Sequence, residues 1–186
     1  MSNPFFTIGH STRPIDEFVA LLMTAEVKLV IDVRTVPRSR TNPQFNRDAL
    51  PASLAAHGIA YEHFAALGGL RGKQPGVSPD VNAFWENESF HNYADYALGE
   101  EFRSGLEKLR ALGHATRSTV MCAESLWWRC HRRIIADYLL ADGEEVFHVL
   151  SPGHVERARL TPAARLEPDG RLIYPKDTPP MLDLRP

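Results

Sequence analysis

Ser118-Thr-Val-Met-Cys-Ala-Glu-Ser-Leu-Trp-Trp-Arg-Cys-His-Arg-Arg133 begins as a buried strand pattern and passes into a turn that holds both cysteines of the chain. The apolar spacing of residues 134–140 then predicts a helix that ends before Gly143. In α/β proteins such a turn lies at the carboxyl edge of the sheet, where ligands bind and helix N-termini favour anions and thiolates. The stretch therefore predicts both the fold class and the place of a functional site.

The same alternation of strand and helix patterns continues on both sides of this stretch. Apolar runs at 5–8, 28–33 and 145–150 predict buried strands, and residues 59–64 alternate as a strand does. Helical spacing is found at 18–25, 46–57 and 93–113, where Gly99 can interrupt the last helix. Ser11 and Thr12 are suited to cap the first helix. The pattern predicts an α/β fold of three layers, with a mainly parallel sheet flanked by helices.

Two segments depart from this alternation. Residues 65–90 are rich in glycine and proline, so we expect a long irregular connection with a short helical piece around Phe84 and Trp85. From Ser151 onward, half of the chain's 14 prolines fall in the last segment. We therefore predict a single α/β domain over residues 1–150 and a proline-rich C-terminal extension, 151–186, that packs on it as an extended wrap.

Composition limits the classes of partner. The chain has 186 residues and a net charge of -2, so no global charge attracts it to nucleic acid or to an anionic membrane. It contains neither an apolar run of the roughly 20 residues that span a membrane nor an N-terminal secretory pattern. We therefore expect a cytoplasmic protein with no membrane partner. In that reducing compartment two thiols are more typical of a reactive, metal-binding or buried role than of a structural disulfide.

Three residues of the turn are candidates for catalysis. Cys122 lies at the predicted end of the strand, where a helix N-terminus and nearby arginines would raise its thiolate fraction. His131 can act as general acid or base, and Glu124 can orient it or take a proton itself. The alternative for Cys122 is a small buried residue. For His131 and Glu124 the alternative is a capping or surface role.

The turn also offers ligands for a metal. Cys122, Cys130 and His131 carry donor atoms that zinc or iron uses, and Glu124 and His10 add further candidates. The spacing matches no standard zinc motif. A disulfide switch between the two cysteines is a further alternative.

The segment 34–47 holds four arginines and no acid up to Arg47. Directly after a strand, it is suited to hold a phosphate, sulfate or carboxylate, with Ser39 as an added donor. The alternative is a solvated loop. Asp32 is placed to pair with Arg34 and fix its guanidinium. Trp127 and Trp128 are more typical of packing, although they are also the candidates to stack a nucleic-acid base.

Several motifs in order resemble the DUF488 family. They are Thr7-Ile-Gly-His-Ser11, Asp32-Val-Arg34 with Pro37 and Ser39, Leu67-Gly-Gly69, Tyr93-Ala-Asp95-Tyr96, Cys122-Ala-Glu124 and Cys130-His-Arg132. The resemblance covers about residues 5 to 150 and implies an α/β domain without implying a reaction. It further implies that the matched positions gather around one pocket: His10, Asp32, Arg34, Tyr93, Cys122, Glu124, Cys130, His131 and Arg132.

A looser similarity is to rhodanese-like domains, in which an Asp-x-Arg strand end precedes a cysteine loop that carries a persulfide. This chain departs from them in the loop, because Trp127 and Trp128 fill its middle and no glycine-arginine loop follows Cys122.

Three hypotheses follow. The first is a small enzyme, a cysteine-dependent transferase, hydrolase or oxidoreductase, that acts on a small anionic substrate. Its catalytic residues would be Cys122, Glu124 and His131, and its substrate-binding residues His10, Asp32, Arg34, Ser39, Tyr93, Cys130 and Arg132. The second is a zinc or iron protein that uses Cys122, Cys130 and His131. The third is a nucleic-acid binding or processing module.

Overall fold

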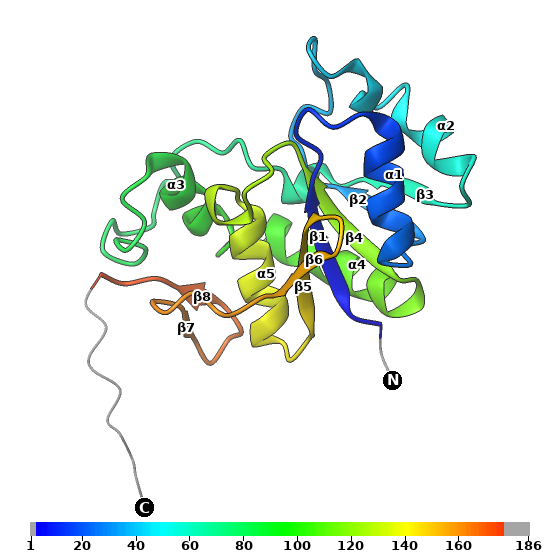
Figure 1. Ribbon diagram of the computed structural model, residues 1–186. Coiled ribbons are helices and arrows are strands. Elements are labelled where there is room, and N and C mark those ends of the chain that lie inside the picture. The colour runs from blue at the N-terminus through cyan, green and yellow to red at the C-terminus, as the bar shows by residue number, and fades with distance from the viewer. Residues whose placement is uncertain (1–2, 177–186) are drawn as a thin grey trace, which may run out of the picture.

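A computed structural model describes residues 3–176 of the chain. Six strands form one sheet in the order β3-β2-β4-β1-β5-β6 (Figure 1). The pairs among β3, β2, β4, β1 and β5 are parallel, and β6 pairs antiparallel with β5. The predicted α/β fold with a mainly parallel sheet is confirmed.

The elements alternate along the chain as the sequence pattern indicates. The strands of the large sheet are β1 (Phe5–Gly9), β2 (Leu29–Asp32), β3 (Ala60–His63), β4 (Ser118–Cys122), β5 (Val146–Ser151) and β6 (His154–Arg157). The helices are α1 (Ile15–Thr24), α2 (Leu50–Ala55), α3 (Glu88–Tyr96), α4 (Glu100–Ala115) and α5 (Arg132–Ala141). A small hairpin, β7 (Arg165–Leu166) and β8 (Leu172–Ile173), follows them.

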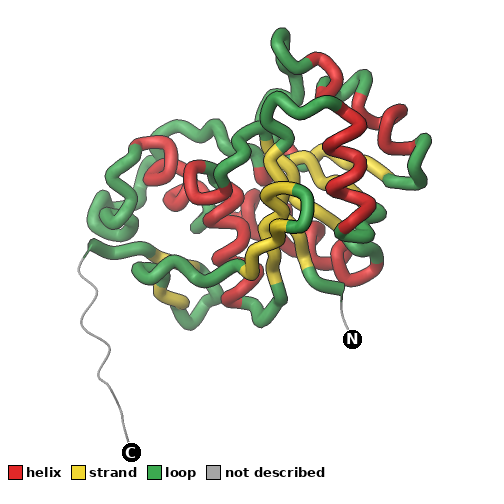
Figure 2. The backbone as a smooth tube through the Cα atoms, in the orientation of Figure 1, coloured by secondary structure: helices red, strands yellow, loops and turns green. Residues whose placement is uncertain are grey.

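Helices cover both faces of the sheet, so its central strands are buried on both sides. One hydrophobic cluster packs the sheet against α1 and α2, and a second packs it against α3, α4 and α5. The helices lie on either side of the strands in Figure 2. This burial explains why β1 and β2 are nearly continuous apolar runs.

The parallel register brings three strand ends to one edge of the sheet. Gly9 of β1 lies beside Cys122 of β4, and Asp32 of β2 lies beside Met121. Backbone bonds extend this pairing into the loops, because His10 N donates to the Cys122 carbonyl and Ser11 N donates to the Ala123 carbonyl. The loops that follow β1, β2 and β4 are therefore held side by side.

The structure differs from the expected local features at two places. Ser11 and Thr12 do not cap α1, because they form the turn after β1 and Pro14 precedes the helix without a side-chain cap. Phe84 and Trp85 are not helical: Phe84 N bonds to the distant Tyr174 O, and the bond from Trp85 N to Asn82 O closes an isolated turn. The expected break at Gly99 is present, since this residue separates α3 from α4.

Beyond residue 150 the chain continues along the domain. β6 extends the sheet, and the hairpin of β7 and β8 is followed by Tyr174, which is fully buried beside α5. Residues 177–186 of the predicted extension lie outside the described residues. The division at residue 150 stays a prediction. Among residues 3–176, no helix is both long and apolar enough to cross a membrane.

Candidate functional site

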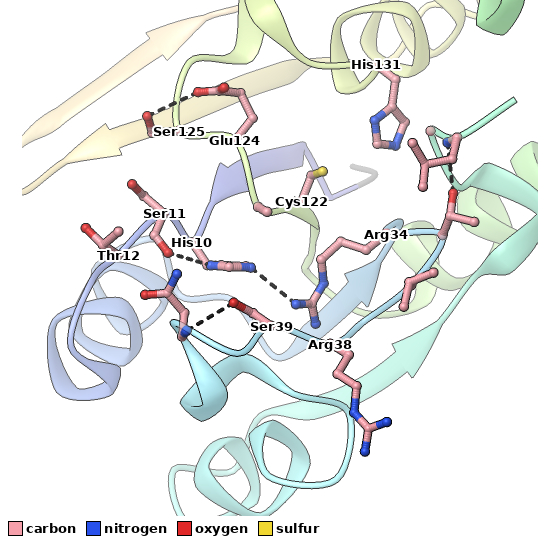
Figure 3. Close-up of a pocket in the computed structure, with 16 residues that line it drawn as sticks. His10, Ser11, Thr12, Arg34, Arg38, Ser39, Cys122, Glu124, Ser125 and His131 are labelled. Carbon is pink, nitrogen blue, oxygen red and sulfur yellow. Dashed lines mark hydrogen bonds between the residues drawn. The ribbon is translucent and has the colours of Figure 1, made fainter. Parts of the chain in front are cut away.

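The ends of β1, β2 and β4 and the start of α5 surround a cavity of about 550 Å³ (Figure 3). Six of the predicted site residues line it: His10, Arg34, Ser39, Cys122, Glu124 and His131. The other four are not in its wall: Asp32, Tyr93, Cys130 and Arg132. The site therefore has an inner layer open to the cavity and a second layer behind it.

Two sulfurs and an imidazole form the centre of the site. Both cysteines are free, and the ligand atoms of Cys122, Cys130 and His131 lie within 4.8 Å of one another. Cys130 Sγ is 3.6 Å from His131 Nδ1. Cys122 is half-buried and points toward His131 in Figure 3, whereas Cys130 is buried. Cys122 thus presents the accessible sulfur, and the less accessible sulfur of Cys130 lies close to it.

The orientation of His131 is fixed by the strand end beside it. Its Nε2–H donates to the carbonyl of Val33 over 2.9 Å. With Nε2–H on the Val33 carbonyl, Nδ1 is the ring nitrogen that faces the Cys130 sulfur, where it can accept a proton from a thiol and donate one to a thiolate. Tyr93 packs edge-on against the ring at 4.9 Å between centroids, and its hydroxyl donates to Leu67 O over 2.8 Å. Tyr93 therefore supports His131 from behind the cavity.

Arg132 is a buried cation whose side chain contacts a sulfur, a hydroxyl and a carbonyl. Its side chain is 1% exposed, and Nε donates to Cys130 Sγ over 3.3 Å. The other nitrogens donate to Thr7 Oγ1 and to the Glu124 carbonyl. In the described part of the chain, no Asp or Glu carboxylate pairs with it. The sulfur of Cys130 is therefore the only contacted group here that can carry a balancing negative charge.

This environment sets the order in which the two thiols ionise. The hydrogen bond to Cys130, followed by burial, raises the pKa of Cys122 well above its ordinary value. Burial alone would raise the pKa of Cys130, but the hydrogen bond from Cys122 and the charge of Arg132 outweigh it and lower that pKa. The sequence pattern indicates a thiolate on Cys122, whereas the lowered pKa of Cys130 and its contact with Arg132 favour a thiolate on Cys130 beside a protonated Cys122.

Asp32 and Arg34 form the ion pair that the sequence indicates. Arg34 Nε donates to Asp32 Oδ1 over 2.9 Å, and Nη2 donates to Oδ2 over 2.6 Å. Arg34 Nη1 also donates to His10 Nε2 over 3.2 Å, while His10 Nδ1–H donates to Ser11 O. Burial lowers the pKa of His10 to about 4, which keeps the ring neutral. The charge of Arg34 is thus already balanced, and its guanidinium is held in one position.

The remaining predicted residues contact their own loops. Glu124 Oε1 accepts from Leu126 N over 2.9 Å, so the Val33 carbonyl, and not Glu124, is what orients His131. Ser39 Oγ accepts from Asn42 N over 3.0 Å. Both side chains line the cavity without contacting the sulfurs.

Arg38 is a cation that the sequence pattern did not single out from its arginine-rich segment. It belongs to the cavity wall and makes no ion pair among residues 3–176. Its guanidinium extends away from Cys122 in Figure 3. Because its charge is unbalanced, it contributes more to the local positive potential than the paired Arg34 does.

Gly69 also shapes the site, although its residue type gives no sign of such a role. A Cβ placed on Gly69 would lie 2.4 Å from His131 Nδ1, so the backbone approaches the ring more closely than any side chain permits. The only signal in the sequence is its place in the Leu67-Gly-Gly69 motif. Val33 carried no such signal, because it acts through its carbonyl.

The tryptophans of the turn are placed differently from each other. Trp127 stacks on His148 with 4.3 Å between ring centroids, so that one of its faces is occupied. Trp128 is 44% exposed. The nucleic-acid hypothesis stays a prediction.

Comparison with known families gives one match. The family model described as domain of unknown function DUF488 matches residues 14–139, which is more than half of the chain. Of the ten predicted site residues, only His10 lies outside that range. Comparisons with curated proteins and with solved structures each gave no match.

Proposed function

Because this chain belongs to the DUF488 family, whose function is not assigned, we propose from its site that it is a thiol-dependent enzyme acting on a small anionic substrate. Cys122 is the reacting thiol, because it is the sulfur in the wall of the large cavity. The cytoplasmic location, where free thiols persist, is part of the proposal.

One observation carries the proposal: Arg132 is buried, pairs with no carboxylate among the described residues 3–176, and touches Cys130 Sγ. An isolated charge inside a protein is costly, and a guanidinium cannot lose its proton to avoid that cost. A thiolate on Cys130 supplies the missing negative charge. A buried arginine is thus best explained by a neighbouring sulfur that is ionised at neutral pH.

The proposed division of labour follows from the contacts. Cys122 attacks an electrophilic atom of the substrate, and its proton moves to the Cys130 thiolate or to His131 Nδ1. The proton that Cys122 gives up then passes to the leaving group, and Glu124, which lines the same cavity, is the candidate to take a proton in its place. Ser39, the fixed guanidinium of Arg34 and the positive charge of Arg38 favour an anionic substrate group.

The first test is thiol reactivity as a function of pH. Iodoacetamide should modify the sulfur pair at pH 6 to 7 faster than a free cysteine, whose pKa is about 8.5. Peptide mass spectrometry identifies the modified sulfur, and Cys122→Ser and Cys130→Ser separate the two contributions. A rate at pH 7 no greater than that of free cysteine would refute the thiol function.

A metal centre is the second candidate, favoured by the spacing of Cys122, Cys130 and His131 within 4.8 Å. The donors fit zinc or iron, because two thiolates and an imidazole with a free Nδ1 form a known kind of site. The Nε2–H bond to Val33 O is the outer contact that metal-binding histidines usually make. These three residues would hold the ion, which would supply Lewis-acid chemistry at the cavity.

Metal content separates the two candidates. A metal centre predicts about one zinc or iron per chain after purification without added metal or chelator, together with a loss of thermal stability in chelator. Protein that is metal-free by elemental analysis and indifferent to chelator contradicts the second candidate and leaves the first in place.

A further inference from the structure

A second cavity reaches the sulfur pair from a different direction. It has a volume of about 360 Å³ and includes Ser89 and Phe90 from the start of α3 in its wall. It shares Cys122, Glu124 and His131 with the larger cavity. Cys130 lines the smaller cavity and not the larger one. The two cavities therefore meet at Cys122, and each gives access to a different part of the pair.

We propose that the two cavities serve the two halves of a dithiol cycle, with a small anionic disulfide as oxidant in the larger cavity and a carboxylate-bearing thiol as reductant in the smaller one. This inference rests on the proposed thiol function and narrows it to thiol–disulfide exchange. It assigns Cys122 to the first partner and Cys130 to the second.

The oxidative half begins at the accessible sulfur. The Cys122 sulfur attacks one sulfur of the bound disulfide RSSR, which gives Cys122–S–SR and releases RS⁻. The Cys130 thiolate then attacks Cys122 Sγ, so that the internal disulfide forms and the second RS⁻ leaves. The proton of Cys122 goes to His131 Nδ1 and then to a released thiolate. Two electrons have passed from the sulfur pair to RSSR, which becomes one thiol, RSH, and one thiolate, RS⁻.

The reductive half begins at the buried sulfur. A thiolate R′S⁻ in the smaller cavity attacks Cys130 Sγ, which gives R′S–S–Cys130 and frees Cys122 as the leaving thiolate. A second R′S⁻ attacks the sulfur of the bound R′S group, which forms R′SSR′ and restores the Cys130 thiolate that Arg132 stabilises. One of the two protons that the R′SH molecules lose on ionising returns to Cys122 through His131 Nδ1, and the other protonates the remaining RS⁻. The cycle therefore consumes one disulfide and two thiols and returns the protein unchanged.

The charge of the smaller cavity indicates the class of thiol. Arg129 lines it and makes no ion pair within residues 3–176, so its guanidinium is available to a carboxylate. The backbone amides at the start of α3 are not available to a carboxylate, because Asn87 Oδ1 already accepts from Ser89 N and Phe90 N. The reductant is accordingly a small thiol that carries a carboxylate, for which glutathione is the probe.

The experiment measures the two half-reactions separately. The reduced protein is mixed with 5,5′-dithiobis(2-nitrobenzoate), an anionic disulfide, and the released aromatic thiol is followed by absorbance. The oxidised protein is then mixed with glutathione, or with uncharged 2-mercaptoethanol, and the return of free thiols is measured after acid quenching. Leu70→Trp obstructs the larger cavity, and Ser89→Trp obstructs the smaller one, since both side chains are exposed at the respective walls.

A crossed pattern supports the proposal: Leu70→Trp slows only oxidation, and Ser89→Trp slows only reduction. Arg129→Glu should slow reduction by glutathione about tenfold without changing reduction by 2-mercaptoethanol. The proposal is overturned if both obstructing variants slow the same half, or if Ser89→Trp and Arg129→Glu leave reduction unchanged.

The failure of this inference is distinguishable from that of the thiol function. If iodoacetamide modifies Cys122 rapidly but no Cys122–Cys130 disulfide forms with the aromatic disulfide, the cycle is wrong and the thiol function stands. If neither sulfur reacts faster than free cysteine with either reagent, the thiol function fails as well.

Discussion

The buried guanidinium of Arg132 needs a negative charge beside it, and a thiolate on Cys130 needs a positive charge, so each residue meets the need of the other. The guanidinium is 1% exposed and its nearest ionisable partner is a sulfur, so neither side chain can be removed without leaving the other poorly matched. This dependence distinguishes a thiolate from an inert buried thiol, because a neutral sulfur would contribute little to the burial of a cation. The contact is therefore measurable as a coupling free energy.

A double-mutant cycle tests this contact. Cys130→Ala alone should lower the free energy of unfolding by about 3 to 5 kcal/mol, because it strands a buried charge. Arg132→Met removes that charge, so the double variant should be less destabilised than the sum of the single variants by about 1 to 3 kcal/mol. Urea unfolding at pH 7.5 gives the three values. Additive losses would mean that Cys130 is a neutral thiol.

Gly69 offers a test of how His131 is positioned. Gly69→Ala places a Cβ 2.4 Å from His131 Nδ1, and displacing the ring should cost about 1 to 3 kcal/mol of stability. The same variant should slow alkylation of Cys122, because the ring no longer faces the sulfurs. Gly72→Ala is the matched control, since nothing lies within 4 Å of a Cβ there. Equal behaviour of the two variants would show that the ring position is unimportant.

Among the elements, those that the sequence predicts are the ones whose patterns are local. β1, β2 and β4 are short buried runs, and their alternation with helices fixes which strand ends meet. The pairing of Asp32 with Arg34 was also predictable, because two positions on one strand end suffice. The bond from His131 to the Val33 carbonyl was not predictable, and neither was the lack of an acidic partner for Arg132 within residues 3–176, because both depend on residues far apart in the sequence.

A buried carboxylate of α5 bonds to the segments on both sides of the C-terminal hairpin. Asp137 accepts from Thr161 N over 2.8 Å and from the Tyr174 hydroxyl over 3.0 Å. Tyr174→Phe should therefore cost about 1 to 3 kcal/mol and raise the pKa of Asp137 further, because the carboxylate loses a donor. Arg171→Ala, which breaks only the exposed pair with Asp169, should change stability by less than about 1 kcal/mol. Thermal unfolding at pH 7 compares the two variants, and equal losses would refute the anchoring role.

For the molecule as a whole, the buried titratable groups have opposite effects on how the free energy of unfolding changes with pH. Burial lowers the pKa of His10 to about 4 and that of His148 to about 3, both from 6.5. Burial raises the pKa of Asp137 from 3.8 to about 6. Below pH 6.5 the unfolded chain binds protons at both histidines that the folded protein does not, which favours unfolding. The carboxyl of Asp137 opposes this, because its stabilising contribution is complete below pH 3.8 and is lost as the pH rises through about 6.

The two histidine shifts together exceed the single aspartate shift, so we expect the free energy of unfolding to fall as the pH drops from 6.5 toward 4. His148→Asn should flatten this dependence, since an amide oxygen can still accept from the Thr7 hydroxyl, which His148 Nδ1 contacts at 2.7 Å. Asp137→Asn should steepen it, because the opposing group is gone. His57→Asn, at an exposed position, should leave the slope as it is. Urea unfolding at pH 7, 6 and 5 measures the slope, and equal or greater stability of the unsubstituted protein at pH 5 would mean that its buried histidines take up protons in the folded state.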